Sequence, residues 1–468
     1  MNVHLTLLLA YSVCLVLLGA WIGRLVKTSD RFFVAGRRLS PLLLFATVLA
    51  ANIGAGSTVG AAGLGYRDGV SAWWWVGCAG IGTLILAFFV GPRIWSIAAK
   101  HDLRTVGDYL DLRYGPSVRG IVASLLWIGT LAILAGQLIA LAWVLEVVAG
   151  IPKVWGCLIG GLVMTTYFTA GGLLTSAWVN LVQLVVLVLG FAIAVPIALS
   201  SVGGLDAVFE ASANARADSL NFWRGGSSGW TYLGLLVPAF IISPGLIQKV
   251  YGARNANTVR WGIGATGVVL LVFAAVPPLL GMIANVSSPG LDNHELALPT
   301  VLVNELPVIL GSLGLAAIFS AEVSSADAIL FMLSTSLSQD LYRRFVNPTA
   351  SDALVLKVSR YAAVGGGVLG VSLAILLPSV IGALGIFYSL LGVSLFVPVV
   401  AGIYTRRGGV PEALAAIAAG VVVLLAVHFG TEGAGFGVWS PTLIGIVAAA
   451  VSFCLVLVMR RKGIPAQS

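Results

Sequence analysis

Long apolar runs recur along the whole chain and are separated by short polar stretches. Because about 20 apolar residues in a helix cross the hydrocarbon core of a bilayer, each run predicts a membrane-spanning helix. The pattern therefore predicts an all-α, multi-pass membrane protein with no room for a soluble domain. We expect thirteen spans, at about 3–23, 41–65, 70–97, 118–149, 152–170, 177–200, 230–248, 261–284, 307–338, 361–378, 380–404, 411–429 and 440–459.

Two of these runs contain residues that interrupt a helix. The second, LFATVLAANIGAGSTVGAAGLGY (44–66), combines glycines with polar residues at mid-depth, and the seventh, YLGLLVPAFIISPGLIQKV (232–250), contains Pro238 and the SPG of 243–245. The two runs are five apart and cross the membrane in opposite directions, which is typical of an inverted five-helix repeat with a site where both helices unwind. The alternative is that these residues only allow close helix packing.

A polar cluster, AEVSSAD (321–327), lies inside the ninth apolar run, where burying charge is costly. On a helix, Ala321, Ser324 and Ser325 share one face, and Glu322 and Asp327 flank it on opposite sides. One carbonyl and two hydroxyls form part of a cage for a hard monovalent cation, which carbonyls freed by an interrupted helix would complete. The alternative is that both serines bond to their own helix or to a neighbouring one.

Composition and charge agree with a membrane protein, because 59% of the residues are hydrophobic and 9% are charged. The net charge of +8 comes from basic residues clustered beside the apolar runs, as orientation signals are, which argues against a nucleic-acid partner. If the N-terminus is outside and the chain crosses the membrane at each span, nearly all basic residues and the C-terminus lie in the cytoplasm. Of the 26 lysines and arginines, those left outside are Arg67, Lys153, Arg216 and Arg224.

The first apolar run is expected to be a retained span. It has no basic residue before it and Arg24, Lys27 and Arg31 after it, which is the reverse of a cleaved signal peptide. The cysteines stand alone without a CxxC pair, which does not support a disulfide framework or a zinc site. The histidines lie near run ends or in loops, which argues against a membrane-embedded enzyme.

Several motifs resemble those of the sodium/solute symporter family, which includes sodium/glucose, sodium/proline and sialic acid cotransporters. In chain order they are AANIGAGSTVGAAGLGY in the second run, TVGDYLDLRYG (105–115), YFTAGGLLTSAWVNLVQ (167–183), LIQKVYGARN (246–255) and AEVSSADAILFMLSTSLSQDLYRR (321–344). The resemblance implies the five-plus-five inverted repeat known from LeuT, with one extra helix in front and two behind. It divides the chain into 1–40, a first repeat at 41–229, a second repeat at 230–408, and 409–468.

The resemblance also implies a sodium site. Its ligands would be the backbone carbonyls of Ala50, Ile53 and Ala321 and the hydroxyls of Ser324 and Ser325. Some family members hold a second sodium near an aspartate, at a position where this chain has Asn180. Because a neutral amide is a poorer cation ligand, we expect Na⁺ as the coupling ion with one sodium per cycle.

A solute pocket is expected beside the two interruptions. Its lining would be Asn52, Ser57, Trp75, Cys78, Ser243, Phe387 and Tyr388, whereas Trp73 and Trp74 favour an interfacial aromatic belt. Sugar-binding relatives place several amide and acidic side chains here, so this weakly polar, aromatic lining argues against a sugar. It suits a small organic acid, an amino acid or a betaine-like cation.

These features predict a sodium-coupled secondary transporter in a bacterial cytoplasmic membrane, with a small-molecule solute, the lipid bilayer and no obligatory protein as its partners. The alternatives are a proton-coupled symporter of the same fold that uses Glu322 or Asp327, and a membrane solute sensor. Asp327 resembles a family acid with a structural or coupling role. Glu322 could hydrogen-bond in protonated form, accept a proton during the cycle, or face a cationic solute.

Overall fold

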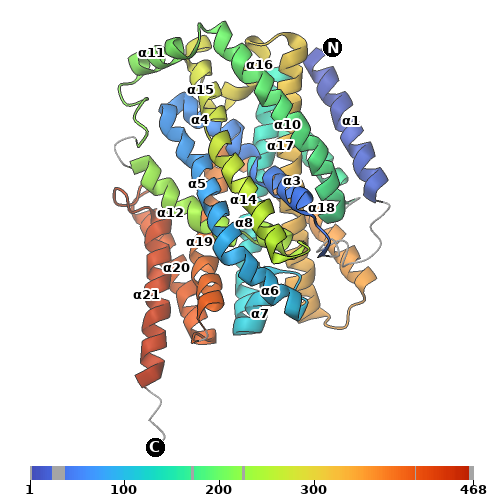
Figure 1. Cartoon of the computed structure of the whole chain (residues 1–468), viewed down its shortest axis with the longest axis vertical. Coiled ribbons are helices and arrows are strands. Elements are labelled where there is room, and N and C mark those ends of the chain that lie inside the picture. Colours follow the sequence, from blue (N-terminus) through green and yellow to red (C-terminus); the bar gives the residue numbers. More distant parts are fainter. Residues whose placement is uncertain (1–2, 24–36, 170–172, 224–226, 406, 463–468) are drawn as a thin grey trace, which may run out of the picture.

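The chain folds as a bundle of helices in this computed structural model, which describes residues 3–23, 37–169, 173–223, 227–405 and 407–462 (Figure 1). Within these residues the only β-pairing consists of two isolated bridges. The α-helices are α1 (Val3–Gly23), α3 (Pro41–Asn52), α4 (Val59–Asp68), α5 (Trp73–Ile85), α6 (Gly91–His101), α7 (Val106–Tyr114), α8 (Pro116–Ala149), α9 (Lys153–Thr169), α10 (Leu173–Ser201), α11 (Leu205–Ala215), α12 (Ser227–Ile242), α13 (Pro244–Tyr251), α14 (Ala256–Phe273), α15 (Val276–Ser287), α16 (Ala297–Asn304), α17 (Val308–Thr335), α18 (Asp352–Leu376), α19 (Val380–Tyr404), α20 (Val410–Gly430) and α21 (Pro441–Lys462).

Each predicted span overlaps a helix or a pair of consecutive helices. In the described part of the chain, ten helices are long and apolar enough to cross a membrane, and Val3–Cys14, Pro41–Asn52 and Lys153–Thr166 are shorter apolar helices. The multi-pass, all-helical class is therefore confirmed, whereas the count of thirteen spans stays a prediction. The predicted basic cluster of Arg24, Lys27 and Arg31 lies outside the described residues.

Large apolar side chains cover much of the outer surface of the bundle. Examples are Trp261, Ile309 and Leu376, each of which is about three-quarters exposed. A soluble monomer rarely exposes this much contiguous apolar surface, but a bilayer solvates it. The polar side chains that are fully buried, such as Thr47 and Glu322, lie inside the bundle instead.

Both predicted interruptions are present, and one of them differs from the prediction. The first membrane helix stops at Asn52 and resumes at Val59, and the second stops at Ile242 and resumes at Pro244. Pro238, expected to interrupt the second helix, instead lies inside α12. A proline in a long membrane helix is tolerated when neighbouring groups satisfy the freed carbonyl, so the Ser-Pro-Gly step alone makes the break.

Helix α17 lies at the centre of the fold and carries the AEVSSAD segment. It packs against α3, α8, α9, α10 and α18, and every residue of the segment is buried. The 3₁₀ segment Ala55–Ser57 lies in the break between α3 and α4. The π-helical segment Ser336–Val346 extends α17 and contacts α7, which lies at the lower end of the bundle in Figure 1.

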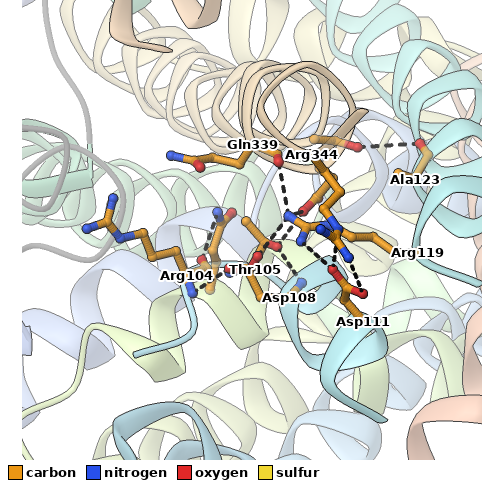
Figure 2. Close-up of polar contacts among 11 residues, drawn as sticks. Arg104, Thr105, Asp108, Asp111, Arg119, Ala123, Gln339 and Arg344 are labelled. Atoms are coloured by element: carbon orange, nitrogen blue, oxygen red, sulfur yellow. Dashed lines mark hydrogen bonds and ion pairs between the residues drawn. The ribbon is translucent and has the colours of Figure 1, made fainter. Parts of the chain in front are cut away.

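Ion pairs join α7, α8 and the end of the α17 extension at that lower end (Figure 2). The Arg119 guanidinium lies 2.7 Å from Asp108, 3.1 Å from Asp111 and 2.8 Å from Asp340, and its side chain is 7% exposed. Arg344 pairs with Asp111 at 2.7 Å. A single buried guanidinium on α8 therefore compensates two carboxylates of α7 and one of the α17 extension, and it fixes the position of that extension.

Replacing Arg119 by methionine should destabilise the protein by about 3–5 kcal/mol, because it leaves buried carboxylates without their cation. Thermal unfolding of purified protein in detergent measures this as a lowered Tm. Arg343→Met is the control, since its pair with Asp352 at 3.6 Å is largely exposed and should change stability by less than about 1 kcal/mol. Equal Tm values for the two variants would contradict a stabilising role for the Arg119 network.

Candidate functional site

The first interrupted helix exposes backbone groups inside the bundle. Helix α3 ends at Asn52, and Ile53 follows in an extended conformation with φ −99° and ψ 101°. A helix that stops leaves its last carbonyls without intrahelical donors. Inside a membrane these groups must find partners within the protein, because no water is present to bind them.

Side-chain oxygens accept hydrogen bonds from the backbone N–H groups of the break, so these N–H groups do not donate to carbonyls of α3. The N–H of Gly54 donates to Ser57 Oγ at 3.0 Å instead of continuing the helix to the Ala50 carbonyl. The N–H of Ala55 donates to Gln137 Oε1 at 2.9 Å, across to α8. The Ala50 carbonyl is thereby left for other partners.

The five predicted sodium ligands meet at this point. Ser324 Oγ lies 3.0 Å from the carbonyl oxygens of both Ala50 and Ala321. Ser325 Oγ lies 3.2 Å from the Ala50 carbonyl and 3.1 Å from the Ile53 carbonyl. Five oxygens from α3 and α17 thus converge in a buried position, a set that suits a small, hard monovalent cation. Both serines bond across to α3, and Ser324 also bonds within α17, so the alternative of bonds to their own or a neighbouring helix describes these contacts as well as a cation cage does.

Gly54 lets the two halves of this oxygen set approach. A Cβ at position 54 would lie 2.3 Å from Ser325 Oγ and 2.7 Å from Gln137 Oε1. Both distances are far shorter than van der Waals contact, so any side chain here would push α3 away from α17 or α8. The backbone at Gly54 is extended, with φ −148°, which any residue can adopt. Glycine is therefore needed here for the close approach of the helices and not for its backbone conformation.

Glu322 faces away from the expected solute pocket. It is fully buried, and its Oε1 accepts a hydrogen bond from Thr58 Oγ1 at 2.8 Å. This bond ties α17 to the start of α4, on the far side of the break from α3. Glu322 is not among the lining residues of the two cavities beside the break, and its role stays a prediction.

Asn180 and Asp327 lie near a buried lysine that the sequence analysis did not single out. Asn180 Nδ2 donates to Thr47 Oγ1 at 3.2 Å, and Lys249 Nζ donates to the same hydroxyl at 3.0 Å. Helix α13, which carries Lys249, packs against α17, which carries Asp327. Neither Asn180 nor Asp327 contributes to the five-oxygen set. The expected motif at 167–183 is only partly visible, since 170–172 lie outside the described residues.

Two small adjoining cavities lie beside the breaks. One, of about 50 Å³, is lined by residues that include Asn52, Ser57, Trp75 and Tyr388. The other, of about 60 Å³, shares Asn52 and Tyr388 with it and reaches Ser243 and Phe387. Among the described residues, Nδ2 of Asn52 is buried without an acceptor. It remains available to an oxygen of a small solute in these cavities.

Cys78 is the one expected pocket residue that lines neither cavity. Trp75, Val76 and Ala79 of α5 do line the first cavity, and on a helix Cys78 lies about 110° from the middle of that face. The inclusion of Cys78 in the solute pocket stays a prediction that the lining of these two cavities does not support. Trp73 and Trp74 instead pack on Phe222.

The structure adds lining residues that the sequence analysis missed. Gln137 lines the first cavity, and Phe240 and Ile133 line both. Gln137 carried a usable signal, because it is the single amide in the long apolar run 118–149 and polar groups at that depth usually serve a site. The apolar residues carried no signal, since they resemble any other core position.

A wider cavity of about 450 Å³ lies at the other end of the bundle from the ion pairs of Figure 2, and it is lined by Arg67, Arg216, Asp292 and His294 among others. Burial, followed by the nearby Arg67 charge, lowers the pKa of His294. The other charged residues among the described lining of this cavity are Arg67, Arg216 and Asp292.

The apolar exterior, the two interrupted helices and the polar groups gathered between them are features of a multi-pass helical membrane transporter. A family model described as the sodium:solute symporter family matches residues 32–420. The chain belongs to the sodium:solute symporter family, whose coupling ion is sodium.

Individual relatives and structures agree with this family. The sodium/glucose cotransporter of Vibrio parahaemolyticus is 25% identical over 80% of this chain and 74% of its own length. High-affinity choline transporter 1 of Caenorhabditis elegans is 24% identical over 89% of this chain and 76% of its own. A substrate-bound, outward-open sodium-coupled sialic acid symporter has the same fold, with a TM-score of 0.83, 20% identity and 98% of each chain covered.

Substituting Gly54 by alanine should destabilise the protein by about 1–3 kcal/mol, because the new Cβ overlaps Ser325 and Gln137 and forces the helices apart. Thermal unfolding in detergent measures the change. The control is Gly385→Ala, where a Cβ would meet nothing within 4 Å. If both substitutions leave the Tm unchanged, the close approach at Gly54 is not required.

Proposed function

We propose that this protein is a sodium-coupled symporter that moves one small organic solute with one sodium ion by alternating access. The observation that carries the proposal is the convergence of Ser324 and Ser325 on the carbonyls freed at the α3 break. In this proposal the sodium ion binds to Ala50, Ile53, Ala321, Ser324 and Ser325 and replaces the hydroxyl-to-carbonyl hydrogen bonds between them. The bound ion would join α3 to α17 more strongly than those bonds do.

The proposed architecture has thirteen spans. Residues 41–229 and 230–408 would form two inverted five-helix repeats, preceded by 1–40 and followed by 409–468. Two facts support this division: the interrupted helices come at the start of each proposed repeat, and the fold matches that of a sodium-coupled symporter. We further propose a bacterial cytoplasmic membrane location with the N-terminus outside, which the distribution of basic residues supports.

The proposed solute is an organic acid, an amino acid or a betaine-like compound, and a sugar fits less well. The cavities are small and mostly apolar, and their walls include the rings of Trp75, Phe240 and Tyr388. Among the described residues neither cavity has a charged lining side chain, so recognition would come from the Asn52 amide for an oxygen and from the rings for an ammonium. The choline transporters among the relatives make a quaternary ammonium a reasonable first solute to test.

The sodium gradient is sufficient to drive accumulation of such a solute. One sodium moving through about 100 mV supplies roughly 2.3 kcal/mol, and a tenfold concentration gradient adds about 1.4 kcal/mol. Together they sustain roughly 500-fold accumulation of a neutral or zwitterionic solute. A second coupled ion is not required.

Alanine at both Ser324 and Ser325 should abolish the sodium-specific rise in Tm, because it removes two of the five proposed ligands and the cross-links to α3. The measurement is a thermal titration of purified wild type and double variant with sodium against potassium at fixed ionic strength. The control is Ser372→Ala, since Ser372 is exposed and its hydroxyl bonds only within α18.

A sodium effect that survives in the double variant would contradict the proposed cage. A Tm shift that follows pH and ignores sodium would instead support the proton-coupled alternative. Once the sodium effect is established, binding of glycine betaine, choline, an amino acid and a monocarboxylate can be measured with sodium present. If the protein is a solute sensor, it should bind one of these solutes without net uptake into proteoliposomes.

A further inference from the structure

Glu295 is a buried carboxylate that joins three parts of the fold. It lies in the 3₁₀ segment His294–Leu296, in the loop between α15 and α16, and is fully buried. Its Oε1 accepts hydrogen bonds from the backbone N–H groups of Val380 at 2.9 Å and Ile381 at 3.2 Å. Its Oε2 accepts from the Val380 N–H at 3.0 Å and from Trp143 Nε1 at 3.0 Å. One side chain therefore ties this loop to the start of α19 and to α8.

The partners of Glu295 suit an ionised carboxylate. All three of these partners are N–H donors, and an ionised carboxylate accepts hydrogen bonds and donates none. Val380 and Ile381 are the first residues of α19, where unpaired N–H groups and the helix dipole favour a negative charge. Hydrogen bonds to an ionised acceptor are roughly twice as strong as those between neutral groups. The carboxylate therefore holds the start of α19 firmly against the loop.

Lys153, at the start of α9, contacts the same region. Its Nζ donates to the Leu377 carbonyl, which lies in the turn between α18 and α19. The same Nζ lies 5.5 Å from the centre of the Trp143 ring, close enough for a cation–π interaction. Trp143 thus contacts both Lys153 and Glu295, and these three side chains form what we call the Glu295 cluster. The cluster connects the loop with α8, α9 and the turn that leads into α19.

The Glu295 cluster lies between the wide cavity of about 450 Å³ and the small cavity of about 50 Å³. His294, the neighbour of Glu295, lines the wide cavity, and Leu384, one helical turn into α19, lines the small one. A Cβ at Gly56 in the first break, or at Gly136 on α8, would overlap a δ-methyl of Leu384. Leu384 therefore fills the space between the break and α8, beneath the part of α19 that Glu295 holds.

We propose that Glu295 is a positioning residue that keeps the small solute cavity closed toward the wide cavity. It holds the start of α19 against α8 and the loop, and α19 in turn holds Leu384 over the small cavity. The inference rests on the proposed function, because transport by alternating access requires the entrance at this end of the bundle to open and close. Weakening the bonds of Glu295 shifts the protein toward the conformation in which the two cavities are joined.

The test uses a cysteine in place of Ala79, which lines the small cavity, as a reporter of access. Its rate of reaction with a membrane-impermeant thiol reagent is measured in right-side-out and in inside-out membrane vesicles. The same chain without the reporter corrects for the four native cysteines. This measurement separates opening at the end of the bundle that carries the α15–α16 loop from opening at the other end.

Glu295→Gln should make the reporter react at least about tenfold faster from the face that carries the α15–α16 loop, and no faster from the other face. An amide has one acceptor oxygen, so its NH₂ group would meet the N–H of either Trp143 or Ile381. The loss of one hydrogen bond to a charged group changes an equilibrium by about tenfold or more. A substitution that only loosened the fold would not select one face.

Trp143→Phe gives a second measurement that does not require Glu295→Gln to fold. It keeps an aromatic ring on α8 and removes the Nε1 donor, so we expect roughly threefold faster reaction from the same face. The control is Glu305→Gln, which makes the same substitution at the partly exposed end of α16. It should change the rate from neither face.

A loop-face rate that stays at the wild-type value in either variant that folds would overturn the role of Glu295. Equal acceleration from both faces would overturn it as well, because it indicates general loosening. The reporter reaction requires neither sodium nor solute. Failure of the proposed sodium coupling would instead appear as the absence of a sodium effect on the Tm of wild type, so the two failures are distinguishable.

Discussion

The structure depends on a helix that stops in the middle of the membrane. Because lipid offers no hydrogen bonds, every N–H and carbonyl freed between Asn52 and Val59 must be satisfied by the protein itself. Ser57 and Gln137 take the N–H groups, which leaves carbonyls whose partners are the two hydroxyls of α17. The geometry of the proposed sodium cage is thus a consequence of how the break is satisfied, and Gly54 is the position that permits it.

The second break places its own charge beside the first. Helix α13 begins at Pro244 after a break of one residue and carries Lys249 back toward α3 and α17. The cage, the helix that carries the lysine and the small cavities therefore all lie against α3 and α17. At the lower end of the bundle in Figure 1, Arg119 anchors the extension of α17 to α7 and α8. A single helix, α17, thus links the proposed ion site to the ion pairs of Figure 2, and a change in its position would be transmitted to both.

The sequence was sufficient for features that depend on local pattern, and insufficient for those that depend on helix rotation. Hydropathy predicted the helices, and the glycines and the Ser-Pro-Gly step predicted both breaks. The five oxygens of the proposed cage followed from the family resemblance and from the shared face of Ala321, Ser324 and Ser325. The sequence could not decide whether Cys78 lines a cavity, because one residue of helical phase determines which side chains of α5 do so. Pro238 was expected to interrupt its helix, but whether a proline breaks a membrane helix depends on its neighbours. Lys249 and the Arg119 network were missed because their partners are far away in sequence.

The most direct test of the sodium cage is equilibrium binding of radioactive sodium to purified wild-type protein, with excess potassium present as competitor. The account predicts saturable binding of about one sodium per protein that potassium does not displace, since the proposed site is completed by a single ion. Absence of saturable sodium binding, or binding that potassium removes equally well, would contradict it.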